Sequence, residues 1–218
     1  MPDAPAIIYC DNHLLCLDKP AGLLTQPSGT ERDSLEAQAK AWLKREFNKP
    51  GAVFLEAVHR IDAPVCGVVL FARTSKALSR LNEAVRNGAC SKEYRALVSG
   101  VPRAKSATLE DWLMHDDHLA RVVPKGTPEA HRARLSYELL DARQDGLSLL
   151  RVRLETGRYH QIRAQLAHAG LPIVGDAKYG SALPYRAGCI ALQHYCLKVP
   201  HPVTKEMLVL TSMQNLQR

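Results

Sequence analysis

The sequence lacks an uninterrupted apolar run of about 18 residues, so no membrane-spanning helix is predicted. Aromatic residues make up only 6% of the chain, which argues against a non-specific single-strand binder built on stacking platforms. The cysteines form no CxxC pair, and HExxH and GxSxG motifs are missing. The lone HxxH, His115 to His118, lies in a polar stretch, so metal chemistry and serine or cysteine hydrolysis have little support.

The composition shows an excess of basic over acidic residues. The chain of 218 residues carries 29 Lys and Arg against 22 Asp and Glu, a formal net charge of +7. Such an excess favours a polyanionic partner through counterion release, although charge alone supports a basic soluble enzyme equally well. The N-terminal segment 1–4 has an acid, Asp3, where a secretion signal would carry Lys or Arg. We therefore expect a cytoplasmic protein with reduced cysteines.

Short strands and a few helices are predicted along the chain. Strands are expected at 6–10, 14–17, 94–98 and 150–154, and the apolar run Gly67–Ala72 is typical of a strand buried on both faces. Helices are expected in three places: capped by Asp33, capped by Ser75 and ending at Gly88, and from His160 to Gly170.

These elements predict an α+β fold, in which a mixed, largely antiparallel sheet has flanking helices. The stretch Asp116–Arg134, rich in Lys, Arg, His, Pro and Gly, is predicted to be a basic surface loop between strands. We expect a single domain over residues 1–218, with a divide between Arg103 and Gly126 as the alternative.

The first polar segment of interest is Val58–Asp62, which directly precedes the buried strand. An acid flanked by His59 and Arg60 at the start of a core strand is costly unless the charges are paired or face a cleft. Local sequence supports two interpretations: an ion pair that anchors the loop, or a functional site.

Two further segments carry polar side chains beside regular structure. Glu155–Arg163 predicts a strand, a glycine-containing turn and a helix, where backbone N–H groups can face an anion. The side chains that add donors there are Arg158, His160, Gln161 and Arg163, which favours an anion or ribose-phosphate site over an ordinary helix start. Ser91–Val98 places Tyr94 on a strand, where a tyrosine is more often a core residue than a catalytic one.

In their order and spacing, the three segments resemble the signature blocks of RluA-type pseudouridine synthases. The matching blocks are His59-Arg60-Ile61-Asp62 with Gly67, Lys92-Glu93-Tyr94-Arg95-Ala96, and Thr156 through Arg163. Asp18 through Leu23, Gly175-Asp176 with Tyr179-Gly180, and His201-Pro202 match as well, so the likeness covers nearly the whole chain. The family usually has a Thr-Ser pair where this chain has Val65-Cys66.

The resemblance implies a pseudouridine synthase-like catalytic fold and the isomerisation of uridine in RNA. Asp62 would be the essential carboxylate, either attacking C1′ of the sugar or removing a C2′ proton. Arg163 would be its ion-pair partner, and Tyr94 would stack on the uracil. Leu192 would supply an apolar wall on the other ring face. No metal or organic cofactor is implied.

On the RNA side, the resemblance implies that Arg60 fills the space left by a flipped uridine. The further residues expected to contact substrate or RNA are His59, Lys92, Arg158, His160 and Gln161. The substrate would be tRNA or rRNA, no S4-type domain would precede the core, and a monomer is the default expectation. Two alternatives stay open: a catalytically silent RNA-binding protein of the same fold, and a hydrolase that cleaves the glycosidic bond.

Overall fold

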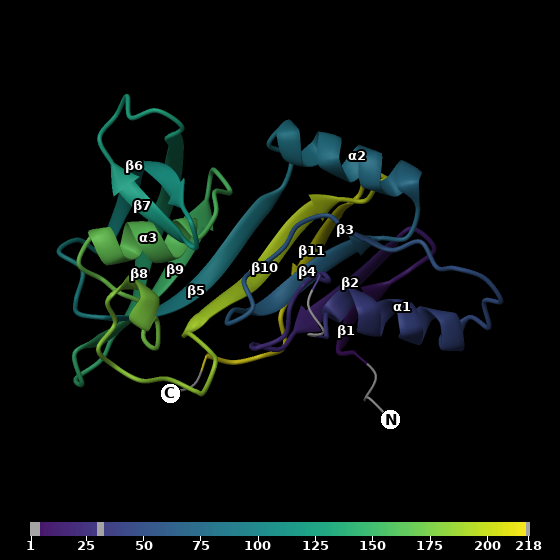
Figure 1. Ribbon diagram of the computed structural model, residues 1–218, viewed down its shortest axis with the longest axis horizontal. Coiled ribbons are helices and arrows are strands. Elements are labelled where there is room, and N and C mark those ends of the chain that lie inside the picture. Colours follow the sequence, from purple (N-terminus) through teal and green to yellow (C-terminus); the bar gives the residue numbers. More distant parts are fainter. Residues whose placement is uncertain (1–4, 30–32, 217–218) are drawn as a thin grey trace. The chain divides into compact units, whose positions relative to one another are not determined.

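The computed structural model describes residues 5–29 and 33–216, which form two compact units (Figure 1). The first unit comprises Met1–Lys92 and His194–Asn215, and the second comprises Glu93–Gln193 and Leu216–Arg218. The chain therefore crosses between units within strand β5 (Ser91–Ser99) and within strand β10 (Leu192–Pro200). Residues 1–4, on which the prediction about secretion was based, lie outside the described residues.

The first unit is built on a sheet in the order β1, β2, β4, β10, with β11 paired to β10 and β3 to β4. Its strands are β1 (Ile7–Cys10), β2 (Leu14–Lys19), β3 (Glu56–Ala57), β4 (Cys66–Ala72), the end of β10, and β11 (Met207–Thr211). The strands predicted at 6–10 and 14–17 are present as β1 and β2, which form an antiparallel hairpin. The carboxylate of Asp11 closes its turn by accepting the backbone N–H groups of His13 (2.8 Å) and Leu14 (2.7 Å).

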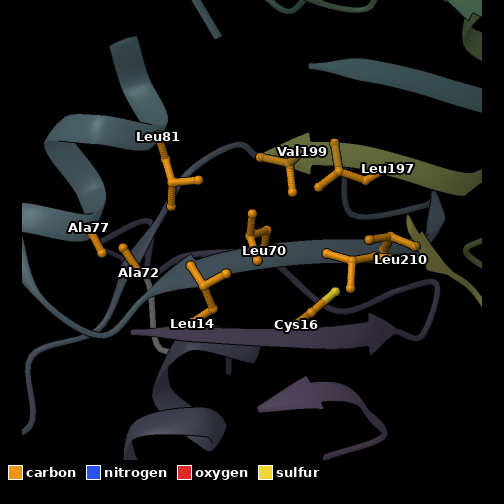
Figure 2. Packing of buried hydrophobic residues seen from close by; sticks show 10 residues of the cluster. Leu14, Cys16, Leu70, Ala72, Ala77, Leu81, Leu197, Val199 and Leu210 are labelled. Atoms are coloured by element: carbon orange, nitrogen blue, oxygen red, sulfur yellow. The ribbon is translucent and has the colours of Figure 1, made fainter. Parts of the chain in front are cut away.

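Strand β4 is buried on both faces, as the apolar run predicted. Figure 2 shows one face, where side chains of β2, β4, β10 and β11 point toward those of helix α2 (Ser75–Arg86). The residues of this cluster that Figure 2 labels are Leu14, Cys16, Leu70, Ala72, Ala77, Leu81, Leu197, Val199 and Leu210. On the other face, Leu15, Leu17 and Phe71 are equally buried. Helix α1 (Leu35–Glu46) lies on the opposite side of this unit's sheet from α2 (Figure 1).

Both helices of the first unit start one residue away from the predicted caps. Ser34 caps α1 and Thr74 caps α2, each by accepting a backbone N–H bond from Ala37 (3.2 Å) or Ala77 (3.1 Å). The predictions of Asp33 and Ser75 were therefore wrong. Each true cap has extended backbone and a neighbour that is also a good cap former, so composition alone does not separate the two. Gly88 follows the end of α2 in the left-handed conformation, as expected.

The second unit has a sheet in the order β5, β9, β8, β6, β7. Its further elements are β6 (Ser106–Asp116), β7 (Leu119–Val123), β8 (His131–Ala142), β9 (Leu147–Leu154), helix α3 (Gln161–His168) and the short 3-10 helix η1 (Ala177–Tyr179). Helix α3 packs against β6 and β7, where Leu113, Ala120, Ala133 and Ala164 form a small core. The predicted third helix and its flanking strand are thus confirmed. No helix in the described residues is long and apolar enough to cross a membrane.

The prediction of a basic surface loop over Asp116–Arg134 was wrong for part of this stretch: residues 119–123 and 131–134 lie in strands, whereas residues 124–130 form a loop between strands. Strand β7 forms a hairpin with β6, and β8 begins at His131. Ion pairs balance much of the local charge: Arg121 contacts Asp116 at 2.6 Å and Arg132 contacts Glu110 at 2.9 Å. The short apolar strand β7 is stabilised by pairing with β6 across the hairpin.

Candidate active site

The predicted carboxylate, Asp62, is half-buried in the loop between β3 and β4 of the first unit. The residues on both sides of it are held by the segment that follows β2. The hydroxyl of Thr25 donates to the carbonyl of Ile61 at 2.9 Å and accepts its N–H at 3.3 Å. The carbonyl of Ala63 accepts the N–H of Gly22 at 2.7 Å. The backbone that carries Asp62 is therefore fixed before and after the carboxylate.

Lys19 completes this clamp from inside the protein. Its side chain is fully buried, and its ammonium donates to the carbonyls of Pro20 (3.0 Å), Leu23 (2.7 Å) and Ala63 (3.1 Å). A buried ammonium is tolerated only when its donors are satisfied, and three backbone acceptors do this here. Reasoning from local sequence missed this role, although the match of Asp18 through Leu23 to the family pattern could have indicated it.

Gly67, which lies five residues after Asp62, occupies a position where only glycine fits. Its φ is +116°, and a Cβ built there would lie 2.2 Å from the backbone oxygen of His194. Real Cβ atoms do not approach that closely, so only glycine lets β4 and β10 meet at this position.

The two residues before Ile61 differ in their surroundings. His59 accepts the backbone N–H of Leu70 through Nε2 at 3.2 Å, and its ring meets the ring of His194 edge to face at 5.1 Å. Burial, with the neighbouring His194 and Lys92, holds the pKa of His59 well below its usual value. Arg60 is exposed to solvent. His59 therefore supports β4, whereas Arg60 extends from the loop.

Lys92, Tyr94 and Leu192 lie on β5 and β10, the two strands in which the chain crosses between units. Lys92 is half-buried, and this burial lowers its pKa. Tyr94 is 7% exposed on β5, and Leu192 is 3% exposed at the start of β10. Tyr94 and Leu192 both belong to the second unit.

Arg163 lies on helix α3 and is almost completely buried. Its Nε and Nη2 donate to the two carboxylate oxygens of Asp176 at 2.7 and 2.8 Å. Its Nη1 contacts Nε2 of His160 at 2.8 Å, and its guanidinium lies over the ring of Tyr179 at 4.9 Å. The resemblance had indicated Asp62 as the partner of Arg163, and it had assigned no role to Asp176.

The turn before α3 is held by a side chain that sequence reasoning assigned to RNA. Gln161 is 2% exposed, and its amide oxygen accepts bonds from the hydroxyl of Thr156 (2.8 Å) and the N–H of Arg158 (3.0 Å). Its amide nitrogen donates to the carbonyl of Arg134 at 3.1 Å. Of the four donors expected to surround an anion, Arg158 alone is exposed, although all four side chains have protein partners.

The structure thus brings the predicted residues together in two groups. His59, Arg60 and Asp62 share one loop of the first unit, and Arg158, His160, Gln161 and Arg163 share one turn and helix of the second. The ion pair between Asp62 and Arg163 stays a prediction. Across the described ranges, no group of three His, Cys, Asp or Glu side chains is placed to bind a metal ion.

Comparison with known proteins gives a consistent result. A family model described as RNA pseudouridylate synthase matches residues 13–168. Ribosomal large subunit pseudouridine synthase C of Escherichia coli is 33% identical over 219 residues, which cover 94% of this chain and 65% of the relative. An uncharacterized RNA pseudouridine synthase of Bacillus subtilis is 31% identical over 207 residues, covering 93% of this chain and 66% of the relative. The chain spans slightly less than two thirds of the length of these relatives.

Solved structures show the same fold. Human RNA pseudouridylate synthase domain containing 4 superposes with a TM-score of 0.80 at 20% identity, covering 96% of this chain and 88% of that one. The predicted fold class, a mixed and mostly antiparallel sheet with few helices, is confirmed. The matched segment also contains all three signature blocks. The chain therefore belongs to the RNA pseudouridylate synthase family.

Proposed function

We propose that this chain is an RNA pseudouridine synthase that isomerises specific uridines, with Asp62 as its essential carboxylate. The observation that carries the proposal is the family match over residues 13–168, a segment that retains Asp62, Tyr94 and Arg163. The clamp around Ile61 and Ala63 supports it, because a carboxylate that reacts at a sugar carbon must be held in one position.

The reaction breaks the N1–C1′ bond, turns the uracil and joins C5 to C1′. Asp62 either attacks C1′ or removes a C2′ proton to form a glycal. In either route Arg163 acts by orienting the carboxylate of Asp62. A guanidinium has five N–H donors, so a bidentate bond to Asp176 is compatible with a further carboxylate.

The uracil ring is proposed to lie between Tyr94 and Leu192. Tyr94 stacks on the ring while it turns. Both side chains are nearly buried, which agrees with a pocket that excludes water from the reacting sugar. A uridine in a stem reaches such a pocket only by leaving the stack, at a cost of a few kcal/mol.

Contacts outside the pocket are assigned to cationic and polar side chains. Arg60 fills the space of the flipped uridine, and its exposure suits that role. Arg158 and Lys92 bind phosphates, with His59, His160 and Gln161 shaping the surrounding loops. Arg158, like Arg60, is exposed.

The preferred substrate is large-subunit ribosomal RNA, because synthase C relatives are named for it. Transfer RNA is the second RNA to test. We further propose that residues 1–218 act as a single catalytic domain, in the cytoplasm, as a monomer, and without metal or organic cofactor.

Product analysis tests the proposal. Purified protein is incubated with large-subunit rRNA and tRNA transcripts, and digests are examined for pseudouridine and for free uracil by mass spectrometry. The proposal expects pseudouridine at discrete positions with no release of base. Free uracil would instead indicate a glycosidic-bond hydrolase. Binding without any product on either RNA, or on total RNA from cells that lack this gene, would indicate a silent RNA-binding protein.

A further inference from the structure

The bond between Arg163 and Asp176 is among the most buried ion pairs in the described structure. The two side chains are 6% and 1% exposed, and both carboxylate oxygens are engaged at 2.7 and 2.8 Å. A bidentate bond of this kind fixes the plane of a guanidinium as well as its position. Such a pair is costly to break, because a lone buried charge is then left behind.

The loop that carries Asp176 is itself tightly placed. Gly175 has φ +86°, and a Cβ there would lie 2.5 Å from Cβ of Tyr185 and 3.0 Å from the carbonyl oxygen of Cys189. The carbonyl of Asp176 accepts the N–H groups of Tyr179 (3.0 Å) and Ser181 (3.1 Å). The carboxylate is therefore presented to α3 from a rigid turn.

The hydrogen bonds beyond Arg163 have determined directions. A guanidinium only donates, so the Nε2 of His160 that meets it at 2.8 Å must be unprotonated. The proton of the neutral ring is then on Nδ1, which donates to the hydroxyl oxygen of Tyr179 at 2.9 Å. That oxygen also accepts the N–H of Ala120 at 2.8 Å. A continuous network runs from Asp176 through Arg163, His160 and Tyr179 to strand β7.

His160 is held in an unusual backbone conformation within this network. Its φ is +49°, in the left-handed region that non-glycine residues seldom adopt. Such strain persists where surrounding contacts over-determine it, and both ring nitrogens of His160 are engaged here. The conformation sets the ring where it can accept from Arg163.

We infer that Asp176 is a positioning residue for the isomerisation, with His160 and Tyr179 as its support. Asp176 holds the guanidinium of Arg163 in one orientation, and the proposed function assigns that guanidinium to the carboxylate of Asp62. This inference rests on the proposed function, since it assigns a role to Asp176 through Arg163. Asp176 itself touches neither the sugar nor the base.

The chain offers a matched control for the role of Asp176. Asp111 of β6 also accepts a bond from a buried side chain of α3, because Nε2 of Gln165 donates to it at 2.7 Å. Asp111→Asn therefore makes the same substitution at a carboxylate that contacts the same helix but not Arg163. If Asp176→Asn and Asp111→Asn lose similar stability, that loss reflects packing of the helix. If only Asp176→Asn loses turnover, the loss reflects the positioning of Arg163.

The experiment compares Asp176→Asn, Asp111→Asn, Arg163→Met and the double variant Asp176→Asn with Arg163→Met. Asp176→Asn is expected to lower kcat about 100-fold while KM and RNA affinity change less than about threefold, as expected of a misplaced catalytic group. Asp111→Asn is expected to keep kcat within about twofold. The double variant is expected to be no slower than Arg163→Met, because Asp176 acts through that side chain.

Two results would overturn the inference: a wild-type kcat in Asp176→Asn, or a double variant whose loss is the product of the two single losses. A second measurement does not depend on enzymatic activity: NMR follows the exchange of the Arg163 Nε–H with solvent. Its protected signal should persist in Asp111→Asn and be lost in Asp176→Asn. If the wild type makes no pseudouridine, the proposed function fails, while this signal still decides whether Asp176 holds Arg163. An unchanged signal in Asp176→Asn would refute the positioning role.

Discussion

The buried ammonium of Lys19 donates to the carbonyl oxygen of Ala63, the residue that follows Asp62, at a distance of 3.1 Å. The same oxygen accepts the N–H of Gly22 at 2.7 Å. A loop at the end of β2 therefore holds the backbone beside the proposed catalytic carboxylate. Because the donor is charged and desolvated, its bonds are stronger than those of a surface lysine.

Replacing Lys19 tests how much this clamp contributes. Lys19→Met removes the donor to Pro20, Leu23 and Ala63 and leaves buried carbonyls with fewer partners. We expect the free energy of unfolding to fall by about 1–3 kcal/mol, measured by urea denaturation. Lys40→Met is the control, since Lys40 forms a partly exposed i,i+4 pair with Glu36 at 2.7 Å. That change should remain within about 0.5 kcal/mol, and equal losses in both variants would contradict the clamp.

Gly67→Ala tests the close approach of two strands. The new Cβ would meet the backbone oxygen of His194 at 2.2 Å in addition to the strain of φ +116°. We expect a loss of more than about 3 kcal/mol or a failure to fold. Gly88→Ala separates the two effects, because Gly88 also has a positive φ, +70°, but nothing lies within 4 Å of a Cβ there. Its expected loss is about 1 kcal/mol, and similar losses at both glycines would show that the contact with His194 is unimportant.

Acid should destabilise the first unit through its two buried histidines. Burial lowers the pKa of His194 to about 3 and holds that of His59 well below its usual value. Between pH 6.5 and about 3 the unfolded chain therefore binds protons that the folded protein does not, so stability falls as the pH falls. Each histidine contributes up to about 1.4 kcal/mol per pH unit in this window.

The measurement for this effect is urea denaturation at pH 7 and pH 5. His194→Asn keeps a donor near the position of Nδ1, which bonds the carbonyl of Val68 at 2.7 Å, but it cannot titrate. We expect the variant to show a smaller loss on acidification than the wild type. An identical pH dependence in both proteins would rule out His194 as a source.

Arg158 is predicted to bind a phosphate. Its guanidinium donates to the carbonyl of Arg132 at 3.1 Å and is exposed, so its charge can contact RNA. Arg158→Gln should weaken RNA binding and reduce the slope of log affinity against log salt by about 1. Arg151→Gln is the matched control, because Arg151 pairs with Glu138 at 2.7 Å and Glu93 at 3.3 Å. Equal slopes for the wild type and Arg158→Gln would remove Arg158 from the interface.

Strands with a clear apolar pattern could be predicted from the sequence, whereas helix caps and the short strand β7 could not be placed correctly. The apolar run Gly67–Ala72 and the alternation at 150–154 each indicated a strand that the structure contains. Helix caps were misplaced by one residue where two cap formers are adjacent. Strand β7 has a single charged residue, Arg121, and it was missed because the surrounding stretch was interpreted from its overall basic composition rather than from the short apolar run within it.

In the candidate site, the sequence identified the site residues but not the contacts that hold them. The three signature blocks indicated Asp62, Tyr94 and Arg163 as site residues, whereas the contacts that hold them could not be deduced. Lys19 reads as a loop lysine in the sequence, and its burial follows only from carbonyls that the folded chain brings together. The bond of Arg163 to Asp176 likewise joins residues 13 positions apart through a turn.

The central claim is that the carboxylate of Asp62 is essential for making pseudouridine. It is tested most directly by quantifying pseudouridine in large-subunit rRNA treated with the wild type, with Asp62→Asn, and with Asp141→Asn, a change at an exposed carboxylate on β8. The account predicts product from the wild type and Asp141→Asn and none from Asp62→Asn. RNA affinity should remain within a few-fold in all three, because phosphate contacts dominate it. Pseudouridine formed by Asp62→Asn at the wild-type rate would contradict the account.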